Sequence, residues 1–342
     1  MSDSLTAVLV GCGGISRAWL KTITQIEGLD LAAAVDLDVS AAQERVDEYD
    51  LTATAVSTDL EDVLERFTPD IVFDCTVPGA HYPVTLAALQ HGCHILGEKP
   101  LADSIDHARA MVAAAEEADR IFAVMQNRRY DANIRRLKAF LESGMLGRLT
   151  TVNCDFYIGA HFGGFRDHME HVLLVDMAIH TFDAARLIMN ADGQAVYCAE
   201  WNPPGSWYDH DAAAVAIFDM SDDLVYTYRG SWCAEGLNTT WESRWHIIGE
   251  NGSLIWDGAE GFEAEVVAER RGFRSEMRRV EVPSLAGPLK DGGHDGAIRE
   301  FVTCVRTGRV PETVASDNIK SLAMVFGAVA SAETGRKVAI TI

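Results

Sequence analysis

The first 38 residues of this chain have the pattern of a strand, a glycine-rich turn, a helix and a second strand that ends in an acid. An apolar run, Leu5 to Val10, leads directly into a glycine-rich turn, and a helical pattern follows as far as Ile26. Glycine is needed where a backbone approaches a pyrophosphate, because a Cβ would not fit, and the next helix begins with free N–H groups that face the anion. The residues predicted to bind the dinucleotide here are Gly11, Gly13, Gly14 and Ile15.

A carboxylate at the end of the next strand predicts which dinucleotide binds. The apolar run Leu31 to Val35 ends at Asp36, about 20 residues beyond the turn, where a carboxylate can accept hydrogen bonds from both ribose hydroxyls. Neither Leu37 nor Asp38 supplies a cation for a 2′-phosphate. We therefore predict NAD rather than NADP. The alternative is an ordinary strand-to-helix turn, since Ser16 stands where the fingerprint usually has its third glycine.

Length and charge exclude several classes of protein. With 342 residues the chain is long enough for two domains, and its net charge of −22 argues against nucleic acid as a partner. No apolar run approaches the length of a bilayer span, and the N-terminus lacks the pattern of a signal peptide. Seven scattered cysteines without a Cys-x-x-Cys pair are typical of a reducing compartment. We expect a cytoplasmic protein that binds neither nucleic acid nor membrane.

The chain is predicted to be an α/β protein with two sheets. Strand and helix patterns alternate over residues 1–126, with a helix over residues 105–117 among them, which predicts a doubly wound parallel sheet of the Rossmann type. Residues 127–342 begin with a helical pattern over residues 132–143, a strand over residues 149–157 and a second helical pattern over residues 173–189, and several short strands follow between residues 195 and 256. Their short connections predict a largely antiparallel open sheet in a second domain. Two final helical patterns, residues 293–306 and 317–333, are candidates to cover one face of that sheet.

Ligands of doubly wound sheets bind beyond the carboxyl ends of the strands, and one scarce lysine falls there. Lys99 is one of six lysines, and Pro100 after it favours an extended backbone at this position. The alternative is a solvated surface lysine. The other polar or turn residues predicted at this edge are Thr76, Val77, Pro78, Glu98, Gln126 and Asn127.

Asp176 and His180 form a second polar pair. They are four residues apart in a helical pattern whose other residues are mostly apolar, so both side chains are predicted on one face of a buried helix. Histidine can accept a proton near neutral pH, and an aspartate can orient the ring or relay the proton. The alternative is a buried pair that only satisfies its own hydrogen bonds.

Taken together, these motifs resemble the Gfo/Idh/MocA oxidoreductase family, and the resemblance covers nearly the whole chain. The resemblance implies an N-terminal NAD(P) domain, a C-terminal α/β domain with an open sheet, and hydride exchange with sugars, cyclitols or related polyols. It also implies that Lys99, Asp176 and His180 match the catalytic lysine, aspartate and histidine. The chain departs from the family pattern on both sides of Asp176, where members often carry glycines but this chain has Val-Leu-Leu-Val at residues 172–175 and Ala178. The motifs that carry the resemblance are the Gly11 turn, Thr76-Val77-Pro78 with His81, Glu98-Lys99-Pro100, Asn127-Arg128-Arg129, Gly144 to Gly147, and Asp176 to His180.

The predicted reaction is the oxidation of a secondary hydroxyl of a sugar, anhydrosugar or cyclitol by NAD. His180 would accept the hydroxyl proton, while cationic Lys99 would stabilise the alkoxide. Two alternatives remain open. The first is a glycosidase that uses tightly bound NAD for oxidation, elimination and re-reduction, and the second is a non-catalytic NAD sensor or scaffold.

Further residues are candidates for substrate contacts. Residues 161–171 are rich in histidine and acidic side chains, but their spacing matches no compact metal motif, so we expect no metal. The predicted substrate contacts, besides Lys99, Asp176 and His180, are Arg128, Arg166, His168, Trp207 and Tyr208.

The face of the second sheet is predicted to be an interface. An exposed sheet face is an aggregation hazard if it is left open, so we expect a homo-oligomer, either a dimer or a tetramer, that buries this face.

Overall fold

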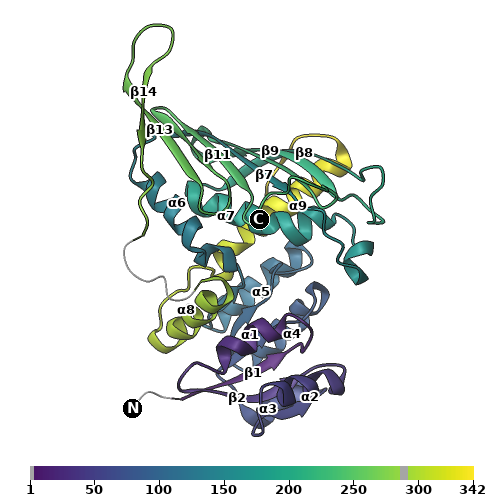
Figure 1. Ribbon diagram of the computed structural model, residues 1–342. Helices are drawn as coiled ribbons and strands as arrows, with labels where there is room; N and C mark the ends of the chain where they lie inside the picture. Colours follow the sequence, from purple (N-terminus) through teal and green to yellow (C-terminus); the bar gives the residue numbers. More distant parts are fainter. Residues whose placement is uncertain (1–3, 286–291) are drawn as a thin grey trace. The chain divides into compact units, whose positions relative to one another are not determined.

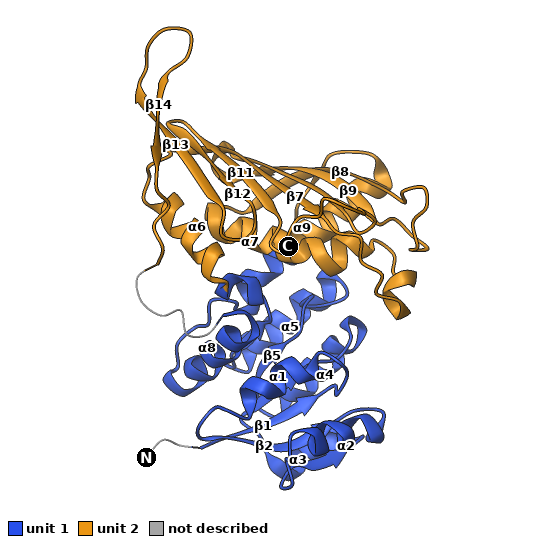
Figure 2. Cartoon of the chain, viewed as in Figure 1, with its two compact units in different colours: residues 1–130, 290–322 blue, residues 131–289, 323–342 orange. Residues whose placement is uncertain are grey.

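The computed structural model describes residues 4–285 and 292–342, which form two compact units (Figure 2). The first unit comprises residues 1–130 and 290–322, and the second comprises residues 131–289 and 323–342. The division falls within the last long helix of the chain. None of the helices in the described ranges has both the length and the apolar composition that a membrane span requires.

The first unit contains a six-stranded sheet with strand order β3-β2-β1-β4-β5-β6, and all its strand pairs are parallel. This is the strand order of the Rossmann fold, which confirms the predicted doubly wound sheet. Its strands are β1 (Leu5–Val10), β2 (Leu29–Val35), β3 (Ala55–Ser57), β4 (Ile71–Asp74), β5 (His94–Gly97) and β6 (Phe122–Val124). Its helices are α1 (Ser16–Ile23), α2 (Val39–Glu48), α3 (Leu60–Phe67), α4 (Pro78–Gln90), α5 (Ile105–Glu117), the 3₁₀ helix η1 (Asn127–Tyr130) and α8 (Gly293–Thr307).

Local sequence explains where several of these helices begin. The side chains of Asp38, Asp59 and Ser104 accept hydrogen bonds from backbone N–H groups at the starts of α2, α3 and α5. Such caps satisfy donors that have no partner within the helix. The central strands are apolar on both faces because helices cover the sheet on both sides.

Helix α8 packs against the first sheet, which differs from the predicted cover of the second sheet. Ile298 and Phe301 of α8 are buried in the same core cluster as Trp19 and Phe73. Phe73 makes edge-to-face contacts with both Trp19 and Phe301. An amphipathic pattern shows that a helix has an apolar face but not which sheet receives it, so sequence alone did not distinguish the two arrangements.

The second unit contains a nine-stranded sheet with strand order β14-β13-β12-β11-β7-β10-β9-β8-β15. Only β7 and β10 pair in parallel, so the predicted largely antiparallel sheet is confirmed. Its strands are β7 (Leu149–Tyr157), β8 (Gly193–Trp201), β9 (Ala213–Met220), β10 (Val225–Ser231), β11 (Arg244–Gly249), β12 (Gly252–Trp256), β13 (Phe262–Glu269), β14 (Glu276–Val280) and β15 (Val338–Ala339). Its helical elements are α6 (Ala132–Glu142), the 3₁₀ helices η2 (Gly164–His168) and η4 (Ser221–Asp223), the π-helix η3 (Leu173–Ala178) and α7 (Ile179–Met189), and α9 (Ala315–Thr334) ends in this unit.

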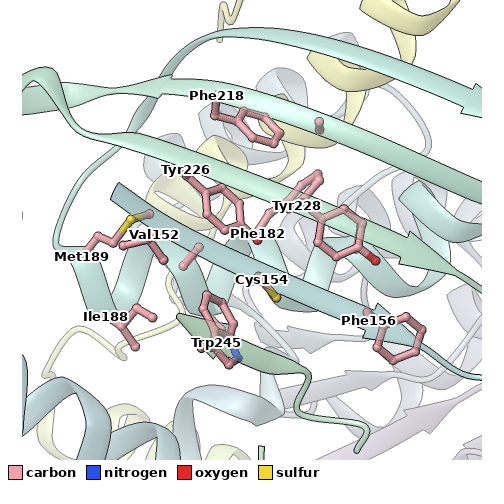
Figure 3. Packing of buried hydrophobic residues seen from close by; sticks show 14 of the residues in the cluster. Val152, Cys154, Phe156, Phe182, Ile188, Met189, Phe218, Tyr226, Tyr228 and Trp245 are labelled. Atoms are coloured by element: carbon pink, nitrogen blue, oxygen red, sulfur yellow. The ribbon is translucent and has the colours of Figure 1, made fainter. Parts of the chain in front are cut away.

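One face of this second sheet is covered by helices, while the other carries polar and partly exposed side chains (Figure 2). On the covered face, Phe182 of α7 meets the rings of Phe218, Tyr226 and Tyr228 at steep angles (Figure 3). These aromatic rings are fully buried and dominate the core of the unit.

Within the glycine-rich turn, Gly11 is the position at which the fold itself requires glycine, independent of any ligand. Its φ is +88°, and an added Cβ would lie 2.7 Å from the carbonyl carbon and oxygen of Cys75. The turn after β1 thus passes directly against the end of β4. Gly13 and Gly14 differ, because a Cβ on either would meet nothing within 4 Å.

We expect Gly11→Ala to lower the free energy of unfolding by at least about 2 kcal/mol, because it combines a left-handed backbone with a clash against a neighbouring strand. Chemical denaturation without added cofactor measures this. Gly14→Ala is the matched control, since it has neither constraint. Equal stabilities of the two variants would contradict the expectation.

Candidate functional site

The glycine-rich turn is held against the end of β2 by Asp36. One carboxylate oxygen of Asp36 accepts the backbone N–H of Cys12 at 2.7 Å, and the other accepts the backbone N–H of Asp38 at 2.9 Å. Gly13, Gly14 and Ile15 are exposed beside this carboxylate. Burial raises the pKa of the Cys12 thiol to about 12, so the residue contributes its backbone N–H to the turn rather than a thiolate.

Asp74, at the end of β4, anchors the next part of the sheet edge. One of its carboxylate oxygens lies 2.8 Å from Nδ1 of His81, and the other accepts the hydroxyl of Thr76 at 2.6 Å. Asp74 and His81 are both fully buried. Burial disfavours both charged forms, but the mutual attraction outweighs it, so the pKa of Asp74 is held below and that of His81 above the ordinary value.

Glu98, at the end of β5, is a second buried carboxylate. It accepts the indole N–H of Trp19 at 2.7 Å and the backbone N–H of Lys99 at 3.1 Å. His294 of α8 lies 3.8 Å away. Burial opposes ionisation of Glu98, but the nearby His294 side chain, the hydrogen bond from Trp19 and the charge of Lys99 hold its pKa below the usual range. The Lys99–Pro100 peptide bond is cis. Glu98 thus fixes the backbone from which the Lys99 side chain starts.

Near the strand ends of the first unit, two described side chains have buried polar atoms without a hydrogen-bond partner. They are Nε2 of His81 and both polar atoms of the Gln126 side chain. Gln126 follows β6, so these groups belong to the strand-end region where a ligand of such a sheet binds. Orphaned buried polar groups are rare in proteins, and a bound ligand is one way to satisfy them. Together with the open space at Gly13 and Gly14, they fit a dinucleotide.

The remaining predicted cofactor and substrate residues of the first unit lie near the same strand ends. Val77 is exposed and caps α4, and Pro78 is the first residue of that helix. Asn127 and Arg128 belong to the 3₁₀ helix η1, in which Arg128 is nearly buried. Sequence analysis singled out neither Asp74 nor Trp19. Asp74 could have been found from the sequence, because it is an acidic residue at the end of an apolar strand.

In the second unit, Asp176 forms an ion pair with Arg166. The guanidinium Nε donates to one carboxylate oxygen at 2.9 Å, and a second nitrogen donates to the other oxygen at 3.4 Å. Arg166 also lies over the rings of Phe162 and Phe165, at 5.0 and 4.9 Å from their centres. The arginine predicted as a substrate contact therefore has a structural partner in Asp176.

Asp176 and His180 lie where a π-helix passes into an α-helix. The predicted single helix is instead the π-helical turn η3, which contains Asp176, followed by α7, which contains His180. Wide π-turns occur frequently at functional sites. This turn includes part of the Val-Leu-Leu-Val segment that departs from the family's glycine pattern.

The start of this helical segment is held by a residue that sequence analysis did not assign. His171 has a φ of +52°, its carbonyl accepts the backbone N–H of Val175, and its Nδ1 lies 2.6 Å from Glu200. The Glu200 side chain is 1% exposed. The hydrogen bond to Glu200 raises the pKa of His171. This pair ties the π-helical turn to β8.

The other predicted substrate residues of this unit contact one another or the backbone. His168 is exposed, and its Nδ1 lies 2.6 Å from Asp209. The Trp207 indole N–H and the Tyr208 hydroxyl both donate to the carbonyl of Ala160, at 2.8 and 2.6 Å. Tyr208 is buried, so the geometry favours a role in anchoring this loop. Within the described ranges, no group of three or more histidine, cysteine or acidic side chains is arranged to hold a metal ion.

Comparison with known proteins identifies the family. A family described as "Oxidoreductase family, NAD-binding Rossmann fold" matches residues 5–126, and the "GFO/IDH/MocA C-terminal domain" matches residues 134–255. Inositol 2-dehydrogenase 4 of Saccharopolyspora erythraea is 31% identical over 303 residues, covering 84% of this chain and 86% of that protein. The chain belongs to the Gfo/Idh/MocA family of oxidoreductases. The family's N-terminal domain is an NAD-binding fold, which confirms the predicted cofactor.

Two further comparisons extend over almost the whole length of the family fold. The 1,5-anhydro-D-fructose reductase of Ensifer adhaerens is 24% identical over 335 residues, covering 96% of both proteins. An oxidoreductase from Agrobacterium radiobacter, solved in complex with NAD+, L-tartaric acid and magnesium, superposes with a TM-score of 0.85 at 23% identity and covers 98% of both chains. This likeness confirms the predicted fold class. The assignment of individual site residues stays a prediction.

We expect the Asp74–His81 pair to give the first unit a pH-dependent stability. The raised pKa of His81 stabilises the fold below its unfolded value of about 6.5, and this contribution is lost as pH rises through the higher folded value. The lowered pKa of Asp74 stabilises the fold above about pH 4 and is lost as pH falls. The difference in Tm between wild type and His81→Asn is therefore expected to be larger at about pH 5.5 than at about pH 9.

Thermal unfolding of both proteins at the two pH values, without cofactor, measures this difference. The exposed His210→Asn is the matched control, for which we expect a small difference at either pH. A His81→Asn effect that does not change with pH would contradict the account of the pair.

Proposed function

We propose that this oxidoreductase uses NAD to oxidise a secondary hydroxyl of a sugar, anhydrosugar or cyclitol. The observation that carries this proposal is Lys99, a cation whose backbone is fixed by the buried Glu98 carboxylate at the strand ends of an NAD-binding sheet. Relatives named for inositol and 1,5-anhydro-D-fructose support the substrate class. Both compounds are polyhydroxylated rings.

The cofactor is proposed to lie along the strand ends of the first unit. Gly13, Gly14 and Ile15 would face the pyrophosphate, and Asp36 would accept the ribose hydroxyls. Thr76, Val77, Pro78, His81, Glu98 and Asn127 complete the proposed cofactor residues. When bound, NAD supplies the hydride acceptor.

Lys99 and His180 are proposed to play different roles at the substrate hydroxyl. A carbinol carbon loses hydride readily only as its hydroxyl loses a proton, so a base and a stabiliser of negative charge are both needed. We assign proton acceptance to the His180 imidazole and stabilisation of the alkoxide to the Lys99 ammonium. Protein dipoles and charges already in place stabilise such a charge without reorganisation.

Asp176 is proposed to act as a fixed hydrogen-bond acceptor. Its two oxygens receive hydrogen bonds from Arg166, which fix the position of the carboxylate. A carboxylate held in this way is a poor proton relay but a good acceptor for a substrate hydroxyl or the imidazole. Arg166 would then contribute through Asp176, while Arg128 and His168 stay proposed substrate contacts.

We expect Lys99→Ala and His180→Ala each to reduce kcat by at least about a hundredfold, because each removes a group that acts on the reacting hydroxyl. NAD binding, measured by calorimetry, is expected to remain close to that of the wild type. Lys21→Ala and His210→Ala are matched controls, since both side chains are exposed and have no proposed role. Turnover near the wild-type rate in either site variant would remove the mechanism.

A further inference from the structure

His171 stands at the start of the helical segment that carries Asp176 and His180, in a backbone conformation that few residues other than glycine adopt. Its φ is +52°, which lies in the left-handed region. A residue with a Cβ stays in this region only where its surroundings hold it there, and such residues gather at functional sites. The contacts around His171 must therefore outweigh the cost of this conformation.

Both nitrogens of the His171 ring face carboxylates from other elements of the second unit. Nδ1 lies 2.6 Å from Oε2 of Glu200, which is near the end of β8 (Figure 1). Nε2 lies 3.7 Å from Oε1 of Glu333, in the last turn of α9. The Glu200 side chain is 1% exposed, and its Oε1 has no hydrogen-bond partner among the described residues. A carboxylate buried in this way depends on the charge of its neighbour.

The charged groups that surround His171 are acidic. Besides Glu200 and Glu333, the neighbouring Glu170 adds negative charge, and Asp211 acts on Glu200. The hydrogen bond to Glu200 raises the pKa of His171, although burial opposes this. Burial and the nearby acids raise the pKa of Glu200, against the attraction of His171. The cluster thus favours a protonated His171, in which both ring nitrogens are donors.

The backbone of His171 leads directly to Asp176. Its carbonyl accepts the backbone N–H of Val175 at 3.0 Å, and Asp176 is the next residue. The π-helix η3 then passes into α7, so His180 follows in the same helical segment. Arg166 holds the side chain of Asp176, while His171 holds the backbone of the turn from which this side chain starts.

We propose that His171 is a positioning residue for the reaction at Asp176 and His180. Its imidazolium ties the start of η3 to β8 and α9, and this tie sets where the Asp176 carboxylate stands. The inference rests on the proposed function, since it assigns His171 to the same site. The alternative is an ion pair that contributes to stability alone. A positioning role makes turnover, and not only stability, depend on the protonation of His171.

Removal of the ring tests the role in turnover. We expect His171→Asn to lower kcat at least about tenfold, because small displacements of a catalytic group reduce turnover steeply. Asparagine tolerates a positive φ, so this variant keeps the backbone conformation and loses the tie. NAD binding, measured by calorimetry, is expected to stay close to that of the wild type. The matched control is His107→Asn, which breaks an exposed contact of the same length, 2.6 Å from Nδ1 to Asp103, and should leave kcat within about twofold.

The variant Glu200→Gln tests the role of charge. Glutamine has nearly the same shape but lacks the negative charge that raises the pKa of His171, so His171 loses its proton at a lower pH. The contribution of a raised pKa is present below that pKa and is lost as pH rises through it. The kcat of Glu200→Gln relative to wild type is therefore expected to fall at least about threefold between about pH 5.5 and about pH 7.5. In a His171→Asn background, Glu200→Gln should give a ratio that does not change with pH.

Hydrogen exchange tests the tie without any turnover. We expect His171→Asn to speed exchange over residues 172–178 at least about tenfold, with residues 183–189 of α7 unchanged. Equal protection in both proteins would overturn the inference, and so would a lower Tm with unchanged kcat or a Glu200→Gln ratio that is independent of pH. If wild type oxidises no inositol, aldose or anhydrosugar, the proposed function fails, whereas faster exchange over residues 172–178 would still support the tie to Asp176.

Discussion

Two ionised carboxylates buried at the ends of neighbouring strands are the constraint on which the first unit depends. Buried charges are costly unless they are paired and hydrogen-bonded, so Asp74 and Glu98 dictate the positions of their partners. Asp74 holds His81 and the turn after β4, and Glu98 holds Trp19 of α1 and the backbone of Lys99. Buried hydrogen bonds thereby hold the edge of the sheet where we propose that the cofactor binds, and a cation held in place is what a preorganised site requires.

In the second unit, polar groups lie on a mostly apolar helical segment and need partners of their own. Asp176 is satisfied by Arg166, and the π-helical turn around it is tied to the sheet by His171 and Glu200. Helices cover one face of this sheet (Figure 2), and fully buried aromatic residues lie in the core on that face (Figure 3).

Sequence predicted the elements whose signals are local, and missed contacts that join distant segments. The helix expected over residues 105–117 and the strand expected over residues 149–157 begin and end at those residues, because a serine cap and strict alternation mark them. Strands β13 and β14 were not predicted, since charged residues occupy their open face and the edge strand has no buried face. Glu98, which accepts the Trp19 indole N–H, is 79 residues from Trp19 in the sequence, and no local pattern predicts such a contact. The π-turn at Asp176 was predicted as ordinary helix, because apolar periodicity does not separate the two.

Deuterium transfer from substrate carbon to the cofactor tests the central claim most directly. A panel of inositols, aldoses and anhydrosugars, deuterated at their carbinol carbons, would be incubated with the protein and either NAD or NADP. We predict that at least one member yields NADH carrying one deuterium for each ketone formed, with NAD preferred over NADP. Absence of reduced cofactor with every member would contradict the assignment.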